Sequence, residues 1–347
     1  MLSNYFIEKY KSLRKQSYLD KLVSYRHQYA FIGAGDHSIG NLYPCIRQLN
    51  IPLRYICTKD PRNAERMAAG FAGCTGTSDL KLLLEDPAVK GVFVCTRPSL
   101  HPELTRQLLS AGKSVFVEKP PAFSREGLEE LIAVQGQQTC MPGLQRRFST
   151  INGLLKKARI GAANYTYRYV TGPYPEGNPI YELFIHPVDN ALSLFGSAHV
   201  AQIVPGGLGN GAITYFLHLE HTNGAKGMLE LSTAHSWSAA RELLEINTAK
   251  ETLLADYPFR LTGLDKPAVI GGIPMEKLFH QPRHQKIYFE NTGFIPVAAN
   301  NSLVSQGFFG EIDHFVRLVE KDSTDDYGRL SSLRNTYEIL DRLQSAR

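Results

Sequence analysis

The chain contains 347 residues, and its 38 basic and 33 acidic side chains give it a formal net charge of +5 at pH 7. The excess lies mostly at one end, because residues 1–28 contain six basic and two acidic side chains, a local charge of +4. A nucleic-acid-binding protein needs a basic face on its fold, so this charge distribution is poor evidence for that class, and we expect no nucleic-acid partner. No apolar run approaches the roughly 18 residues needed to cross a bilayer, which excludes an integral membrane protein.

The rest of the composition is typical of a globular protein in a reducing compartment. With 43% hydrophobic residues the chain can bury large cores, and its length predicts about two domains of roughly 150 residues each. The five cysteines are widely spaced and form no CxxC pair. This argues against a disulfide scaffold or a zinc knuckle, and we expect no metal site. The N-terminus lacks the apolar core of a signal peptide, so we expect a cytoplasmic protein.

Residues 1–28 predict a basic helical extension in front of the first domain. Apolar side chains recur there at helical spacing, at Leu2, Phe6, Tyr10 and Leu13. The basic, tyrosine-containing face would suit a membrane surface, a partner or an organelle-targeting role. We favour an extra helix packed on the first domain, because acidic residues interrupt the basic face.

From residue 29 to about residue 148 the chain alternates between short apolar strands and helices. The predicted strands are Tyr29–Ile32, Leu53–Thr58, Val89–Cys95, Ser114–Val117 and a short one at Thr139–Met141. One of the intervening helices is opened by Asp60-Pro61, and Asp79 can cap another. Repeated strand–helix units form a parallel, doubly wound sheet, so residues 29–148 are predicted to be an α/β domain of the Rossmann type.

Residues 149–347 have a different pattern. Strands are predicted at Asn164–Val170, Ala212–Leu219, Ala225–Leu231 and Leu243–Asn247, without a helix between each pair. Consecutive strands of this kind favour an α+β domain with a mostly antiparallel sheet. Two helices, Glu311–Val319 and roughly Ser331–Leu343, are predicted to close the chain.

A glycine turn follows the first predicted strand. Gly33-x-Gly35 stands where the chain opens a helix, and this is the dinucleotide-binding arrangement. The first glycine makes a tight turn, and the second lets the backbone approach a pyrophosphate held at the helix N-terminus. Ser38 stands at the third position of the GxGxxG pattern, where it could alter the packing of helix on strand or donate to a phosphate.

The end of the second predicted strand bears on the choice between NADP and NAD. An acidic residue there binds the ribose of NAD, whereas basic and hydroxyl groups accommodate the 2′-phosphate of NADP. Thr58 ends the strand, with Lys59 beside it and Arg62 close by, so we favour NADP. Asp60 provides the alternative, as the ribose acceptor of NAD, unless it only caps the next helix.

Four further segments follow the predicted turn along the chain. They are Thr96-Arg-Pro-Ser-Leu-His101, Glu118-Lys-Pro120, Gly143-Leu-Gln-Arg-Arg-Phe148 and Glu182-Leu-Phe-Ile-His-Pro-Val-Asp189. In this order they resemble the glucose–fructose oxidoreductase/inositol dehydrogenase/MocA (Gfo/Idh/MocA) family of nicotinamide-dependent enzymes. The resemblance covers roughly residues 29–347 and leaves the basic N-terminal extension outside it.

The resemblance implies that the nicotinamide lies in a cleft between a Rossmann domain and an α+β domain. Members of the family commonly oxidise a secondary alcohol of a sugar, inositol or related polyol, or reduce the matching carbonyl. Many form dimers or tetramers through the open face of the second sheet, so we expect a homodimer or homotetramer. The resemblance also implies that Lys119 is the catalytic lysine and His186 the acid/base histidine, with Glu182 at a position usually held by Asp.

The chemistry of these side chains agrees with those roles. Hydride removal from a carbinol carbon requires removal of the hydroxyl proton, which a histidine can take near neutral pH. A lysine ammonium beside the same oxygen would stabilise the developing alkoxide or relay the proton. A carboxylate four residues before His186 could orient its ring or join the relay. The alternatives are that Lys119 is a surface lysine and that His186 is a packed histidine.

Other side chains are predicted to surround the same crevice. The predicted cofactor-binding residues are Gly33, Gly35, Asp36, His37, Ser38, Thr58, Lys59, Arg62, Thr96, Pro98, His101 and Glu118. The predicted substrate-binding residues are Lys119, Arg147, Tyr181, His186 and Asp189. Three of them have structural alternatives. Glu118 could tie the turn after its strand, Arg147 could form a solvated pair with its neighbour, and Asp189 could join a polar network.

The sequence departs from the family pattern around the predicted acid/base pair. Asn178–Tyr181 replaces a glycine run, Arg97 replaces a proline, and Glu182 is one methylene longer than Asp. Pro187 lacks an N–H, so a helix through it should begin close to His186. These departures leave open a catalytically weak cofactor-binding protein that acts as a sensor or binding partner. A cofactor-dependent lyase or glycosidase is a further alternative.

Overall fold

The computed structural model describes most of the chain, in seven segments. They are residues 2–19, 24–158, 163–207, 211–279, 284–292, 301–321 and 327–346. Asp20 and Lys21 of the predicted extension, and Arg347 at the end of the second predicted domain, lie outside the described residues.

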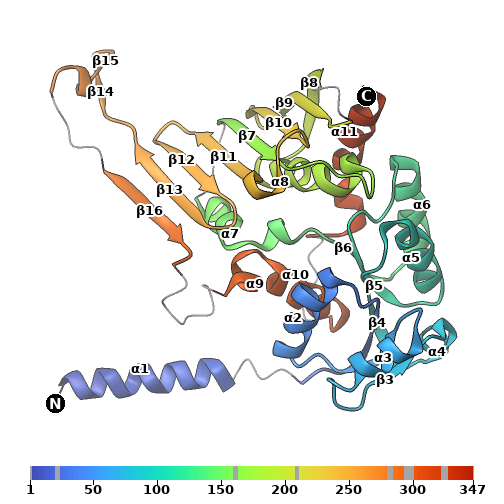
Figure 1. The fold of residues 1–347 in the computed structure, drawn as a ribbon. Coiled ribbons are helices and arrows are strands. Elements are labelled where there is room, and N and C mark those ends of the chain that lie inside the picture. The colour runs from blue at the N-terminus through green and yellow to red at the C-terminus, as the bar shows by residue number, and fades with distance from the viewer. Residues whose placement is uncertain are drawn as a thin grey trace.

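The first domain is built on a six-stranded parallel sheet of strand order β3-β2-β1-β4-β5-β6 (Figure 1). Its strands are β1 (Gln28–Ile32), β2 (Leu53–Cys57), β3 (Thr75–Thr77), β4 (Val89–Val94), β5 (Ser114–Glu118) and β6 (Cys140–Gly143). Its helices are α2 (Tyr43–Gln48), α3 (Pro61–Ala68), α4 (Leu80–Glu85), α5 (His101–Ser110) and α6 (Arg125–Gln135). The predicted Rossmann-type fold is confirmed, and β3 is the strand that the sequence pattern did not predict.

Both faces of this sheet are buried, which is why its central strands are apolar throughout. One face packs against α5 and α6, whereas the other packs against α2 and against α10 (Phe308–Val319). Phe315 of α10 contacts Phe93 and Phe116 edge to face, with ring centroids 5.2 and 5.9 Å apart. A helix from the C-terminal part of the sequence therefore completes the core of the first domain.

The second domain is built on an eight-stranded sheet of strand order β16-β13-β12-β11-β7-β10-β9-β8. Its strands are β7 (Asn164–Val170), β8 (Ala198–Gly206), β9 (Thr214–His221), β10 (Lys226–Ser232), β11 (Arg241–Asn247), β12 (Glu251–Asp256), β13 (Arg260–Asp265) and β16 (Gln285–Glu290). The β7–β10 pair is parallel and the other pairs are antiparallel. The predicted mostly antiparallel sheet is confirmed, with four more strands than the sequence indicated.

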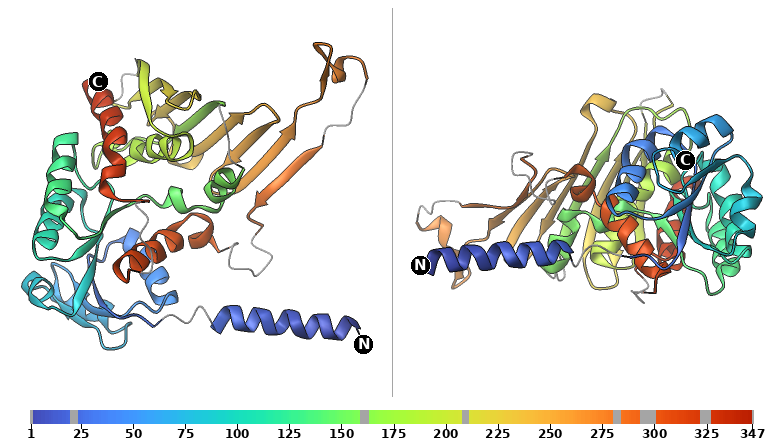
Figure 2. Two further views of the ribbon diagram at one scale, coloured as in Figure 1. Left: turned by 180° about the vertical axis from the view of Figure 1, so that it is seen from behind. Right: turned by 90° about the horizontal axis from the view of Figure 1, so that it is seen from below.

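Helices cover one face of this second sheet and leave the other open (Figures 1 and 2). The covering helices are α7 (Thr150–Lys157), α8 (Ile185–Phe195) and α11 (Arg334–Ser345). On this inner face Tyr165 stacks on Phe195 of α8 with ring centroids 4.2 Å apart. The open face carries exposed apolar side chains, among them Phe216 and Met228.

Short elements complete the described part of the chain. They are α9 (Ser302–Ser305), the β14–β15 hairpin (Val269–Ile270 and Ile273–Pro274), two π-helical turns, η1 (Ser38–Leu42) and η4 (Ile180–Phe184), and the 3₁₀ turns η2 (Pro98–Leu100), η3 (Gln145–Phe148), η5 (Trp237–Ala239), η6 (Met275–Lys277) and η8 (Leu330–Leu333). The β14–β15 hairpin lies at the far end of the β13–β16 ribbon, away from the body of the protein (Figure 1).

The N-terminal helix α1 (Leu2–Leu19) points away from both domains (Figures 1 and 2). Every α1 side chain that the structure describes is exposed, including Phe6, Tyr10 and Leu13. The predicted helix is therefore present, but the expectation that it packs on the first domain is wrong. No helix among the described residues is long and apolar enough to cross a membrane.

Candidate active site

The turn after β1 has the backbone of a phosphate-binding loop. Gly33 has φ +115°, and a side-chain carbon there would lie 1.9 Å from the carbonyl oxygen of Cys95, so only glycine fits. A carbon on Gly35 would meet nothing within 4 Å, so the space beside its backbone is open to a ligand. Ser38 is buried, and its Oγ donates a 2.8 Å hydrogen bond to the Gly35 carbonyl. The turn therefore fits a pyrophosphate at the start of the following helix.

A side-chain bridge crosses the carboxyl ends of the central strands. His37 Nε2 lies 3.2 Å from Oε1 of the buried Glu118, whose Oε2 accepts the main-chain N–H of Lys119 at 3.2 Å. Burial opposes ionisation of Glu118, but the hydrogen bond from His37 and the charges of His37, Lys119 and His101 lower its pKa below the ordinary value. Glu118 therefore ties the turn after β5, as one of its two predicted roles required. Asp36 is exposed beside this bridge.

The residues that follow β2 lie at the same carboxyl edge of the parallel sheet and are partly exposed. The Asp60 carboxylate accepts the main-chain N–H of Arg62 at 3.0 Å and caps α3. It also forms an ion pair with the Arg62 guanidinium, which is 85% exposed. The Thr58 hydroxyl donates to the Asp60 carbonyl at 2.6 Å, and Lys59 is exposed. Asp60 thus has the helix-capping role that the sequence left open.

The end of β4 is linked to the end of β5 by His101. The ring of His101 is buried, with Nε2 3.1 Å from the Thr96 carbonyl and Nδ1 3.0 Å from the Pro120 carbonyl. Burial lowers the pKa of His101. Pro98 begins η2, which leads into the helix that carries His101. The structure therefore brings together Thr96, Pro98 and His101, three of the predicted cofactor-binding residues, at the carboxyl ends of β4 and β5.

Lys119 joins the two domains. It follows β5, and its Nζ donates a 2.8 Å hydrogen bond to the main-chain carbonyl of Glu182 in η4. Burial lowers the pKa of Lys119, and the nearby Arg146 guanidinium adds to this effect, whereas the Glu118 carboxylate opposes it. Lys119 is therefore an oriented donor at the domain interface and not a surface lysine.

His186 lies at the start of α8, four residues after Glu182, whose carbonyl accepts the Lys119 hydrogen bond. Its helix begins at Ile185, in agreement with the position of Pro187 in the sequence. The residue is 7% exposed, and its Nδ1 has no hydrogen-bond partner among the described residues. Burial lowers the pKa of His186 well below its ordinary value, and the positive charges of Arg146, Lys119 and His37 add to this. A lowered pKa favours the neutral imidazole at pH 7, and within the described part of the chain one of its nitrogens is left without a partner.

The Glu182 carboxylate is directed into the preceding loop. Its Oε2 accepts the hydroxyl proton of Tyr174, and its Oε1 accepts the main-chain N–H of Asn178, both at 2.8 Å. A side-chain carbon on Gly177 would lie 2.3 Å from Oε1, so the loop closes tightly on the carboxylate. Since Nδ1 of His186 has no partner, Glu182 does not orient the imidazole through that nitrogen. The expected carboxylate–imidazole contact is therefore not observed at Nδ1.

Three predicted substrate contacts lie in buried structural networks instead. Arg147 and Asp189 form a two-pronged ion pair, and Arg147 also donates to the Ser332 hydroxyl at 2.8 Å. The pair is 6% and 2% exposed, so Arg147 is not part of a solvated arginine pair. The Tyr181 hydroxyl donates to Asp341 of α11 at 2.5 Å. The structure does not aim these side chains at Lys119.

Arg146 is a residue of the site that the sequence pattern did not predict. Its Nε lies 2.6 and 2.7 Å from the two carboxylate oxygens of Glu242 on β11, which also accepts the Tyr167 hydroxyl proton at 2.6 Å. The Arg146 charge lowers the pKa values of both Lys119 and His186. In the sequence, only the motif Gly143–Phe148 indicated a role for Arg146. That motif contains two adjacent arginines and does not show which of them approaches the site.

A family comparison identifies the first domain. Residues 27–144 match the family model GFO_IDH_MocA, described as an oxidoreductase family with an NAD-binding Rossmann fold. The first domain therefore has the NAD-binding Rossmann fold of the Gfo/Idh/MocA oxidoreductase family. The match spans β1 to β6 and so contains the glycine turn, Glu118 and Lys119.

Curated relatives match part of the length of the chain. The Escherichia coli oxidoreductase YhhX is 38% identical over 154 residues, which cover 40% of the chain and 44% of that protein. A dTDP-3,4-didehydro-2,6-dideoxy-α-D-glucose 3-reductase from Streptomyces antibioticus is 25% identical over 204 residues, which cover 53% of the chain and 61% of that protein. The chain thus spans about half the length of the curated relatives it matches.

Solved structures share the fold of the chain over nearly its whole length. A dehydrogenase from Chromobacterium violaceum is 17% identical, with a TM-score of 0.78 over 93% of the chain and 96% of that protein. KijD10, a 3-ketoreductase from Actinomadura kijaniata in complex with NADP, is 17% identical, with a TM-score of 0.69 over 92% of the chain and 97% of that protein. At these identities the comparison shows the two-domain architecture.

Lys119 and His186 bring chemically complementary groups to the junction of the two domains. Lys119 offers N–H donors, and His186 offers a neutral ring with an unpartnered nitrogen. The open backbone at Gly35 fits a nicotinamide dinucleotide, which supplies a hydride donor or acceptor when bound. The site can therefore combine proton transfer with stabilisation of an oxyanion.

Proposed function

We propose that the chain is an NADP-dependent oxidoreductase that acts on a secondary alcohol or ketone of a sugar, inositol or related polyol. The observation that carries this proposal is the pairing of Lys119, held at 2.8 Å on the Glu182 carbonyl, with the buried and unpartnered imidazole of His186. Both lie where the carboxyl end of β5 meets the second domain, the usual ligand position in a doubly wound fold.

Each of the two side chains has a defined role in the proposed reaction. The neutral His186 accepts the hydroxyl proton of an alcohol substrate, and the imidazolium returns a proton when a ketone is reduced. The Lys119 ammonium donates to the substrate oxygen and stabilises its negative charge. Glu182 acts through its main chain, because its carbonyl fixes the direction of Lys119 Nζ. The Arg146 guanidinium, which is paired with Glu242, lowers the pKa values of both groups.

The end of β2 supports a preference for NADP over NAD. The Asp60 carboxylate is engaged by the main chain and side chain of Arg62, so it is not a free acceptor for ribose hydroxyls. Lys59 and Arg62 are exposed at the same corner and can meet a 2′-phosphate. KijD10, which shares the fold, was solved with NADP.

The relatives support a sugar-like substrate. One curated relative is a 3-reductase of a dTDP-linked dideoxy sugar, and a UDP-N-acetylglucosamine 3-dehydrogenase from Acidithiobacillus ferrooxidans shares the fold with a TM-score of 0.72. Both names describe reactions at a ring carbon of a sugar. We therefore assign this chain a small-molecule substrate with a sugar-like ring or a polyol chain.

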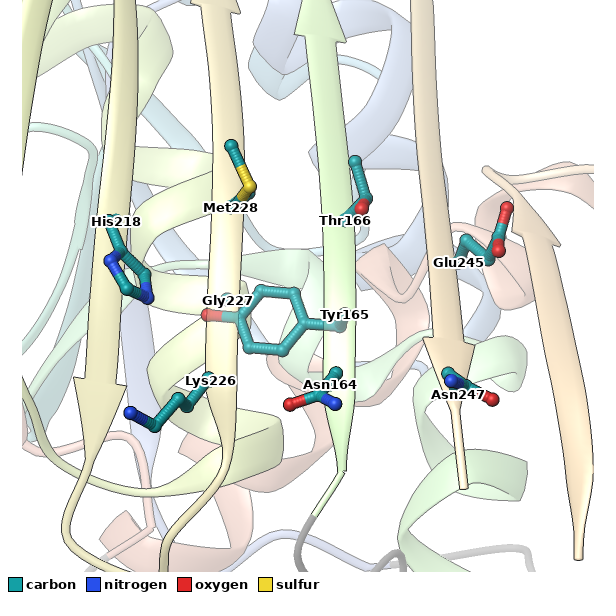
Figure 3. Close-up of a pocket in the computed structure, with 9 residues that line it drawn as sticks. All are labelled: Asn164, Tyr165, Thr166, His218, Lys226, Gly227, Met228, Glu245 and Asn247. Carbon is teal, nitrogen blue, oxygen red and sulfur yellow. The ribbon is translucent and has the colours of Figure 1, made fainter. Parts of the chain in front are cut away.

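We also propose that the chain forms a homodimer or homotetramer through the open face of the second sheet. A hollow of about 340 Å³ lies there among His218, Lys226, Met228 and Glu245 (Figure 3). The hollow is lined by β7, β9, β10 and β11, with no residue of the candidate active site. Exposed apolar side chains such as Met228, which is 60% exposed, suit a second copy better than water.

Turnover of a defined panel tests the proposed function. The protein is incubated with NADP(H) or NAD(H) and a set of polyols, sugars, keto-sugars and nucleotide-linked sugars, and nicotinamide absorbance is followed. We expect turnover with NADP(H) that is lost in Lys119→Ala and His186→Ala, both of which should remain folded. Unchanged rates in both variants would overturn the assignment. Product formation without a net change in absorbance would instead indicate a lyase or glycosidase.

A further inference from the structure

A cavity with aromatic walls lies next to Arg146, at the ends of β7, β11 and β12. Its volume is about 420 Å³, and its walls include Tyr169, Trp237, Tyr257 and Phe259. Of these four rings, Trp237 is 52% exposed and Phe259 is 60% exposed. Exposed aromatic rings around a concave site are characteristic of ligand pockets. We call this cavity the aromatic pocket.

Trp237 is held rigidly in the wall of the aromatic pocket. Its Nε1–H donates a 2.9 Å hydrogen bond to the carbonyl of Pro173. A side-chain carbon on Gly172 would lie 2.5 Å from Cδ1 of the indole, so the ring packs directly on the glycine backbone. The indole is therefore fixed along one edge while half of its surface faces solvent, which is the geometry of a stacking platform.

A short series of contacts connects the aromatic pocket to the candidate active site. The rings of Trp237 and Tyr174 have centroids 6.5 Å apart, and the Tyr174 hydroxyl donates to the Glu182 carboxylate at 2.8 Å. The main-chain carbonyl of Glu182 in turn accepts a hydrogen bond from Lys119 Nζ. Arg146, which lines the pocket, lowers the pKa values of Lys119 and His186. Arg146 is thus shared by the wall of the aromatic pocket and the surroundings of Lys119 and His186.

The charges around the aromatic pocket are balanced. Arg146 is paired with Glu242, and the two remaining charged lining residues, Arg241 and Asp256, have opposite signs. The pocket therefore has aromatic walls without an excess of either charge. This combination favours a neutral aromatic ring over a free phosphate or carboxylate, because flat rings gain from stacking while an anion would find no net positive charge.

We propose that the aromatic pocket binds an aromatic ring that the substrate carries beyond its reacting sugar. Two sources share this chemistry, the aryl group of an aryl glycoside and the base of a nucleotide-linked sugar. The proposal rests on the proposed function for the position of the sugar at Lys119 and His186. It predicts that a bare monosaccharide or inositol binds more weakly than the same sugar with an aromatic group attached.

The chain contains its own reporter for this test, because Trp237 is its only tryptophan. Fluorescence of the full chain is titrated with phenyl and methyl β-glucosides, phenyl and methyl β-galactosides, UDP-glucose, dTDP-glucose, and the nucleosides uridine and thymidine. We expect a saturable change in Trp237 fluorescence with at least one aromatic ligand, at a Kd at least tenfold below that of its nonaromatic counterpart. The phenyl and nucleotide arms distinguish the two sources.

Two variants locate the binding. Phe259→Ala removes an exposed wall of the aromatic pocket and should weaken binding of the aromatic ligand at least fivefold. Phe216→Ala is the matched control, because Phe216 is 45% exposed on the open face of the second sheet and outside the pocket. Comparable Tm values show that both variants are folded. Equal losses in the two variants, or no aromatic preference with any probe, would overturn the proposal.

The same experiment separates this proposal from the proposed function. Ligand binding at Trp237 is measured without turnover and without cofactor. An aromatic preference in a protein that turns over no alcohol or ketone supports the pocket and contradicts the oxidoreductase assignment. Turnover of sugars with no aromatic preference supports the oxidoreductase and contradicts the pocket.

Discussion

The ammonium group of Lys119 and the main-chain carbonyl of Glu182 lie 2.8 Å apart, in a hydrogen bond that joins the Rossmann sheet to the second domain. Lys119 stands directly after β5, and Glu182 lies in the π-helical turn that leads into the helix of His186. One contact therefore sets both the direction of the lysine and its position relative to the histidine. A π-helical turn at this place is consistent with a functional site, because such turns often occur there.

Replacement of Lys119 by Met should abolish turnover and leave the fold intact. The substitution removes a buried cation while keeping most of the side-chain volume. We expect kcat to fall by about 100-fold or more, since a positioned charge at a developing oxyanion contributes that much. Steady-state kinetics and NADPH binding measure the two effects separately. The control variant Lys90→Met, at an exposed lysine of β4, should retain full activity.

His186→Gln should alter the dependence of the melting temperature on pH. Burial holds the pKa of His186 well below its unfolded value. Its contribution to stability is therefore complete above about pH 6.5 and is lost as the pH falls through that value toward the folded pKa. We expect the wild type to lose Tm between pH 7 and pH 5 more steeply than the variant. Parallel Tm curves for the two proteins would contradict a buried neutral imidazole.

The first domain follows closely from local sequence patterns. Its central strands are continuous apolar runs between turn residues, and Asp60 and Asp79 cap the predicted helices by accepting main-chain N–H groups. The strand Thr75–Thr77 has no such pattern, because it is three residues long and contains glycine. It is held by pairing with β2 and not by its own composition.

The second domain and the candidate site were harder to predict from the sequence, because they are formed by contacts between residues that are distant in the chain. Strands such as Glu251–Asp256 are half charged or polar, because one face of the sheet is open. Lys119 and His186 were found through their motifs, and the structure brings them together. The neighbouring arginines show the limit of that approach. Arg146 approaches the site, whereas Arg147 is buried away from it. The two positions differ because Arg146 pairs with Glu242 and Arg147 pairs with Asp189, and both partners are distant in sequence.

Arg147→Met should destabilise the protein strongly. It leaves Asp189 as a buried carboxylate without its two-pronged partner, and loss of one member of a buried pair typically costs about 3–5 kcal/mol. The double variant Arg147→Met/Asp189→Leu removes both charges and should regain much of that stability. Urea denaturation measures the difference. A substrate-binding role for Arg147 would instead raise KM with little change in unfolding free energy.

Lys59→Ala and Arg62→Ala should weaken the binding of NADPH more than that of NADH. Both side chains are exposed at the end of β2, where the 2′-phosphate would add two negative charges. We expect the Kd for NADPH to rise about tenfold in the double variant, equivalent to about 1.4 kcal/mol, with little change for NADH. Fluorescence titration with both cofactors gives the comparison. An equal loss for the two cofactors would contradict the preference for NADP.

Glu311→Gln should make the protein more stable at high pH. Glu311 lies fully buried on α10, and its carboxyl oxygens make no hydrogen bond of normal geometry with the described residues. Burial raises its pKa well above the ordinary value, and the negative charge of Glu118 adds to the rise. The folded protein therefore keeps this carboxyl protonated at a pH where the unfolded chain has released the proton. The resulting contribution to stability is complete below about pH 4.5 and is lost as the pH rises toward the folded pKa.

The amide that Glu311→Gln introduces cannot ionise and has nearly the shape of the protonated acid, so the variant avoids that loss. We expect its unfolding free energy at pH 8, measured by urea denaturation, to exceed that of the wild type by on the order of 1 kcal/mol, the equivalent of one pKa unit. The margin should shrink as the pH is lowered toward 5. Glu242→Gln is the contrasting variant, because that carboxylate is paired with Arg146 and needs its charge. It should lower the unfolding free energy at both pH values, and a gain in both variants would show that burial of Glu311 is not the cause.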